Sequence, residues 1–137
     1  MLLARLLLSA TALGFGLAPF VMDLSTSHAF NPAWPAHARF HAVWLVGVLA
    51  ALALAMLVLT WRGNKDDARG NLAFATALGW VAILPFGLAA LAMPVYGGAL
   101  SAPGHEIAVL GLNSNLMGFG LAAGMLAVAT WLVMRRR

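Results

Sequence analysis

The chain contains no cysteine, and only 9% of its 137 residues are charged. The first absence excludes disulfides, thiol nucleophiles, iron–sulfur clusters and thiolate zinc sites. The second separates the chain from soluble domains, in which about a quarter of the residues are charged. The net charge is +4, but the basic residues flank apolar runs and form no stripe interleaved with aromatic residues. We therefore expect no nucleic-acid partner.

Hydrophobic residues, in contrast, make up 63% of the chain and are gathered into four long runs. A helix needs about 20 apolar residues to cross the hydrocarbon core of a bilayer, and each run meets that length. We predict helices over about 2–22, 36–61, 71–95 and 106–134, in a single integral membrane domain that covers 1–137. The expected fold class is all-α, a four-helix antiparallel transmembrane bundle in the lipid bilayer.

The basic residues predict the orientation of this bundle, because Lys and Arg concentrate on the cytoplasmic side of membranes. Arg5, the 62–69 segment and the 135–137 end carry all of them except Arg39. Both termini are therefore expected to be cytoplasmic, in a multi-pass protein of the cell (inner) membrane. The segments 23–39 and 96–106 are then expected to face outward. A cleaved signal peptide is the alternative for the first run, although the run is long for one.

Glycines predict how the helices contact one another. Gly118, Gly120 and Gly124 lie on the fourth run, and the last two form a G-x-x-x-G pair. Small residues let helices approach closely in membranes. We favour packing within the chain over a homo-oligomer or a membrane partner bound through these glycine-rich faces.

All four histidines fall on the predicted outer side, and two of them have the spacing of metal ligands. His37 and His41 are four residues apart, so a helix presents both rings on one face. A helix offers two nitrogen ligands to one metal ion in this way. His28 is the expected third ligand, with His105 and Glu106 less favoured. The cofactor would be one divalent transition metal ion, and zinc, iron, manganese and copper are not distinguished.

Further polar residues on the same side are candidates for binding a small molecule: Asp23, Arg39, Asn113 and Trp34. Opposite charges near a low dielectric attract strongly, so we favour an ion pair between Asp23 and Arg39. The alternative is that Arg39 holds an anionic group while Asp23 orients a histidine. Asn113 is expected to face the same pocket.

These residues predict a polar, histidine-rich pocket at the outer mouth, which binds a metal ion or a lipophilic or anionic small molecule. A catalytic version would use His37 and His41 as acid–base groups. The alternative is a non-catalytic accessory subunit of a membrane complex. Transport is the weakest hypothesis, because the membrane centre offers few polar groups. Whether the protein is an enzyme stays open.

The first outer segment also resembles a known motif, His-x-Phe-Asn-Pro-x-Trp-Pro-x-His-x-x-Phe-His. The matching positions are His28, Asn31, Pro32, Trp34, Pro35, His37, Phe40 and His41. The motif is similar to that of a group of small four-span membrane proteins from fungi and bacteria, which form a domain family of unknown function. The resemblance implies a four-helix integral membrane protein and implies no activity.

Overall fold

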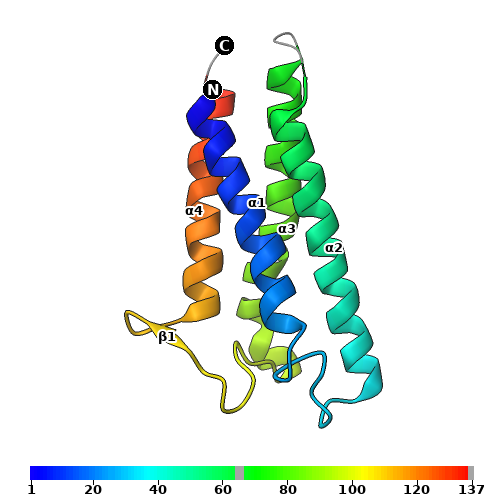
Figure 1. Ribbon diagram of the computed structural model, residues 1–137. Coiled ribbons are helices and arrows are strands. Elements are labelled where there is room, and N and C mark those ends of the chain that lie inside the picture. The colour runs from blue at the N-terminus through cyan, green and yellow to red at the C-terminus, as the bar shows by residue number, and fades with distance from the viewer. Residues whose placement is uncertain (64–66, 136–137) are drawn as a thin grey trace.

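Four helices dominate the computed structural model, which describes residues 1–63 and 67–135 (Figure 1). They are α1 (Leu2–Asp23), α2 (Ala36–Trp61), α3 (Ala68–Tyr96) and α4 (Ser114–Met134). The shortest has 21 residues, and at 1.5 Å per residue it is about 32 Å long, enough to cross the hydrocarbon core. The prediction of four helices long and apolar enough to span a membrane is confirmed. The length and composition of the four helices are those of a multi-pass membrane protein.

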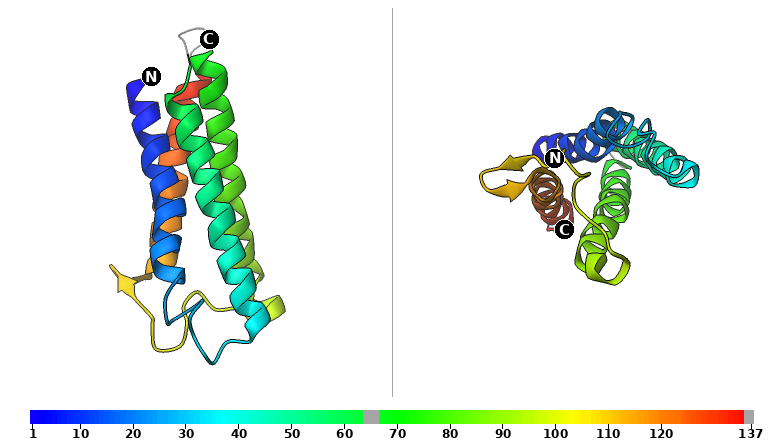
Figure 2. Two further views of the ribbon diagram at one scale, coloured as in Figure 1. Left: turned by 45° about the vertical axis from the view of Figure 1, so that its right-hand side comes forward. Right: turned by 90° about the horizontal axis from the view of Figure 1, so that it is seen from below.

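The helix ends gather at two opposite ends of the molecule (Figures 1 and 2). The start of α1, the end of α2, the start of α3 and the end of α4 lie together. The segments that join α1 to α2 and α3 to α4 lie at the other end. We call this second end, formed by residues 24–35 and 97–113, the histidine end, because the four histidines lie in or beside these segments.

Small and aliphatic side chains form the core between the helices. Helix α1 packs mainly against α2 and α4, α3 packs against the same two helices, and α1 and α3 share a smaller contact. The buried hydrophobic residues of α1 are spaced three or four apart, as one helix face requires: Ala4, Leu8, Ala12 and Phe15. Gly16 lies against Ala53 of α2, and Gly79 of α3 lies against Leu126 of α4. Glycine at these two positions lets the helices approach closely.

The glycine-rich face predicted for packing within the chain is not used in that way. A Cβ atom added at Gly118, Gly120 or Gly124 would meet no other atom within 4 Å. Helix α4 instead buries a different stripe, Ala122, Leu126, Ala129 and Val133. The G-x-x-x-G pair therefore faces away from the tight helix contacts. The glycine pattern in the sequence did not predict the face of α4 that packs against its neighbours.

The fourth helix also starts later than 106, the predicted residue. Residues 108–113 form a hairpin of two short antiparallel strands, β1 (Ala108–Val109) and β2 (Leu112–Asn113). Its turn, Leu110–Gly111, has positive φ at both residues, as the tight hairpin turns require. The Asn113 side chain then accepts a hydrogen bond from the Asn115 amide and caps α4. A cap of this kind sets where a helix begins, and hydropathy alone does not reveal it.

Candidate functional site

His37 and His41 form a pair on the first two turns of α2. Pro35 precedes the helix with an extended backbone, and the helix then carries both rings on one face. The two Nε2 atoms are 3.0 Å apart, and the ring centroids are 4.5 Å apart with the planes nearly perpendicular. At this distance one imidazole donates its Nε2–H to the Nε2 lone pair of the other. The two Nε2 atoms therefore face each other within hydrogen-bond distance.

Aromatic rings surround the pair and continue along the same face. Phe40 stacks against His37 at 6.4 Å between centroids, and Trp44 lies 5.8 Å from His41. We call His37, Phe40, His41 and Trp44 the aromatic strip. All four side chains are exposed, and beside them lies a shallow apolar depression lined by Phe40, Val43 and Trp44. The strip therefore faces away from the bundle.

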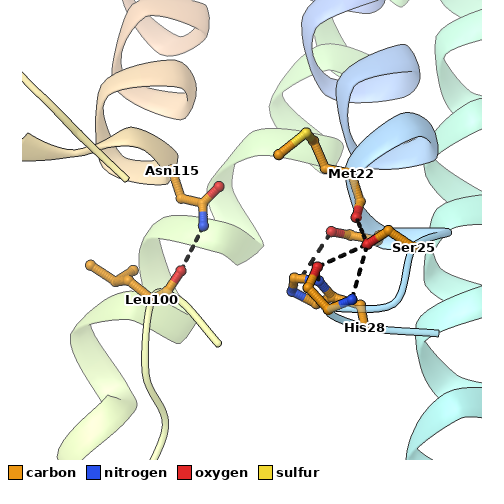
Figure 3. A network of polar contacts seen from close by, with 7 residues as sticks. Met22, Ser25, His28, Leu100 and Asn115 are labelled. Atoms are coloured by element: carbon orange, nitrogen blue, oxygen red, sulfur yellow. Dashed lines mark hydrogen bonds and ion pairs between the residues drawn. The ribbon is translucent and has the colours of Figure 1, made fainter. Parts of the chain in front are cut away.

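His28 lies in a second, separate network that closes the end of α1 (Figure 3). Ser25 donates its hydroxyl proton to the Met22 carbonyl at 2.6 Å. The Ser25 and Ser27 hydroxyls are 2.8 Å apart, and Ser27 Oγ is 2.8 Å from His28 Nδ1. The Ser25 proton is already used, so Ser27 must donate to Ser25, and His28 Nδ1–H must donate to Ser27.

This proton count has a chemical consequence. A serine nucleophile needs a neighbouring base that accepts its proton, whereas Ser27 here gives its proton to Ser25. The network is therefore structural and holds the loop after α1 against the end of that helix. We call Ser25, Ser27 and His28 the serine clasp. The remaining ring nitrogen, His28 Nε2, lies 3.9 Å from Asp23 Oδ1, and the ring packs edge-on against Trp34 at 5.3 Å.

Asp23 therefore pairs with His28, and the expected ion pair with Arg39 is not among the contacts within 4.0 Å in the described residues. Proximity explains the difference, because the tight turn after α1 returns His28 to the helix end: the Ala29 amide donates to the Asp23 carbonyl at 3.0 Å. The Nε atom of Arg39 is buried and has no hydrogen-bond partner within 1–63 and 67–135.

Asn113 and Asn115 tie the 97–113 segment to α4. Asn113 Nδ2 donates to Ser101 Oγ at 2.8 Å, and Asn115 Nδ2 donates to the Leu100 carbonyl at 2.6 Å (Figure 3). The Asn113 Oδ1 atom is occupied by the cap described above. Both ends of the Asn113 amide therefore make hydrogen bonds within the chain.

The structure thus brings His37 to His41 and His28 to Asp23 and Trp34, but it does not unite these groups. Among the described residues, no three His, Asp or Glu side chains lie close enough together to hold one metal ion. His105 and Glu106 are exposed in the 97–113 segment, and Glu106 accepts a hydrogen bond from the Gly104 amide. A second depression, between α3 and α4, has a volume of about 370 Å³ and is lined by apolar residues such as Trp80 and Phe119.

Sequence reasoning missed the serine clasp. Its signal was the Ser25-x-Ser27-His28 spacing directly after a helix end, since serines there commonly bond to nearby backbone and side-chain groups.

Comparison with known proteins adds a family and no activity. No curated protein sequence and no solved structure matches the chain. A family profile, in contrast, matches residues 7–130, which include all four helices in whole or in large part. The chain belongs to the family of unknown function DUF6640.

Proposed function

We propose that this protein binds a divalent transition metal ion at the histidine end through His37 and His41. The observation that carries the proposal is the 3.0 Å separation of the two Nε2 atoms. Two nitrogens bound to one tetrahedral zinc ion at about 2.0–2.1 Å are roughly 3.3 Å apart. To become two ligands, the pair needs to open by a few tenths of an ångström, one ring must change tautomer, and both rings must turn so that their Nε2 lone pairs face the ion.

The proposed orientation places this site outside the cytoplasm. Apart from Arg39, the described arginines lie at the end opposite to the histidine end: Arg5, Arg62, Arg69 and Arg135. Basic residues favour the cytoplasmic side. The four helices would then form an antiparallel bundle with both termini in the cytoplasm and the histidine end on the outer side, in the inner membrane of a bacterial cell.

Metal binding is tested with purified protein in detergent. The parent chain, stripped with a chelator, is titrated with Zn²⁺, Cu²⁺, Mn²⁺ and Fe²⁺, and the bound metal is measured after desalting. We expect retention of zinc or copper by the parent and by His105→Ala, whose ring is exposed and outside the pair. We expect loss in His37→Ala and in His41→Ala. Equal metal content in all four proteins would refute the proposal.

A second candidate function rests on Arg39. Its Nε atom is buried and lacks a hydrogen-bond partner in the described part of the chain, and an unpaired buried donor is costly. Arg39 as a whole is only partly buried, so a lipid phosphate or a carboxylate that bound its guanidinium in the usual forked geometry would reach Nε after a small rotation of the side chain. Comparing the binding of phosphatidylglycerol and phosphatidylcholine by the parent and by Arg39→Gln tests this candidate. Equal lipid preference in the two proteins would remove it.

A further inference from the structure

We propose that the metal site is completed by a second copy of this chain, so that one ion joins two copies through His37 and His41 of each. This inference rests on the proposed function, because it assumes that the pair binds metal. It adds a specific partner, a stoichiometry and a role for the ion in assembly.

The histidine pair supplies fewer ligands than a closed metal site needs. A tetrahedral zinc or copper site requires four ligands, and stable structural sites take all of them from protein. The pair supplies two nitrogens, and no third His, Asp or Glu in 1–63 and 67–135 joins them. The missing ligands must come from outside the chain, and a second pair has the right number and chemistry.

The membrane restricts how two copies of the chain can be related by symmetry. All copies of a chain insert with the same orientation, so a two-fold axis between two copies runs along the membrane normal. Such an axis brings each residue to its own counterpart at the same depth, as in the self-complementary interfaces of soluble dimers. A metal ion on the axis then receives His37 and His41 from both copies at one level.

The face of α2 that carries the histidine pair is free in the described chain. On α2 the buried residues Val46 and Ala53 point toward the other helices. His37, His41, Trp44 and Val48 follow the i, i+4, i+7, i+11 spacing of one stripe, and all four are exposed. No element of the described chain covers the stripe, and a second α2 helix can therefore lie along it.

The ion would also provide most of the attraction. Apolar side chains in a bilayer gain little by leaving lipid for one another, so Phe40, Trp44 and Val48 alone drive association weakly. Four metal–nitrogen bonds add a strong and specific term. We therefore expect a monomer without metal and a dimer with it.

The experiment measures the mass of the protein and the metal content in the same detergent sample. Zn²⁺ alone is the probe, added to chelator-treated protein. We expect the protein mass to double from 14.3 kDa, with one ion bound per two chains, and to return to its initial value with excess chelator. His105→Ala should behave like the parent, whereas His37→Ala and His41→Ala should stay monomeric and bind no zinc.

Cross-linking in liposomes gives a second readout that leaves both histidines in place. The chain has no cysteine, so a single introduced cysteine reports only its own position. Val48→Cys lies on the stripe, about 10 Å along the helix from His41, and Val21→Cys is an exposed control on α1. A short bismaleimide should join Val48→Cys chains severalfold more with Zn²⁺ than with chelator, and Val21→Cys chains equally in both.

The outcomes separate the two proposals. One zinc ion bound to each monomer would overturn the shared site and leave the proposed function standing. Absence of zinc binding by the parent would overturn the shared site, and failure to retain any of the four metal ions would overturn the proposed function as well. A dimer that persists in chelator, or in His37→Ala, would also overturn the inference, because the ion would not be what joins the chains.

Discussion

Replacement of Gly16 by alanine tests the closest helix contact of the fold. A Cβ atom at Gly16 would overlap the Cβ of Ala53 and come within 3.6 Å of the Leu49 carbonyl. Helices α1 and α2 would have to move apart, and inserting a methyl group into a tight contact typically costs about 1–3 kcal/mol. The substitution also has an opposing, stabilising effect. Glycine is more flexible in the unfolded chain than alanine, so its replacement in a helix stabilises the folded state by up to about 1 kcal/mol.

Gly14→Ala provides the matched control, since a Cβ at Gly14 meets no atom within 4 Å. It has the same propensity gain without the clash, so the difference between the two variants isolates the contact. We expect Gly16→Ala to be less stable than Gly14→Ala by about 1–3 kcal/mol, in reversible unfolding with SDS in mixed micelles followed by tryptophan fluorescence. Ala53→Gly should recover most of this loss in the double variant, because it removes the opposing methyl group.

Two results would contradict the reasoning. If Gly16→Ala and Gly14→Ala unfold at the same SDS fraction, the two helices do not approach closely at Gly16. If Gly16→Ala is destabilised but Ala53→Gly brings no recovery, the cost arises elsewhere and the assigned contact is wrong.

The remaining predictions concern the hairpin and two buried or capping polar groups. Leu110 has a φ of 52°, a conformation that costs a residue with a side chain about 1–2 kcal/mol, so Leu110→Gly should raise the thermal midpoint; a lower midpoint would show that the leucine side chain has a stabilising contact. Asn113→Ala removes the α4 cap and the hydrogen bond to Ser101, and should lower the free energy of unfolding by about 1–2 kcal/mol. Asn113→Asp should restore part of this loss, and equal stability of the alanine and aspartate variants would argue against a cap. Trp80→Phe removes the hydrogen bond from the indole N–H to Thr130 Oγ1 at 3.0 Å, which links α3 to α4, and should lower the free energy of unfolding by about 1 kcal/mol. A double-mutant cycle with Thr130→Val measures the coupling, and zero interaction energy would exclude this bond as a stabilising contact.

Much of the architecture was accessible from the sequence, because its cause is local. Four runs of apolar residues must be helical in lipid, where each backbone polar group has to be satisfied within its own segment. The His37–His41 contact is equally local, since the helix repeat alone brings residues four apart together. These two features required no knowledge of how the helices pack.

The rest of the candidate site depended on groups that the sequence could not bring together. The serine clasp turns His28 toward Asp23, and so Arg39 did not obtain the expected partner. The glycines of α4 have the pattern of a packing face, but Gly16 and Gly79 make the close contacts. A small residue allows two helices to approach closely but does not require it. The arrangement of the neighbouring helices decides which glycines lie in a close contact.

The amino-acid sequence by itself therefore determined the number of apolar helices, their approximate bounds apart from the start of α4, and the pairing of two imidazoles, because hydropathy and helical repeat act locally along the chain. The tertiary structure decided which charges meet, which glycines are covered, and that the imidazole pair faces outward without a third ligand from the described chain. These outcomes depend on side-chain volumes and on backbone turns between elements, whose effects appear only when all four helices are in place.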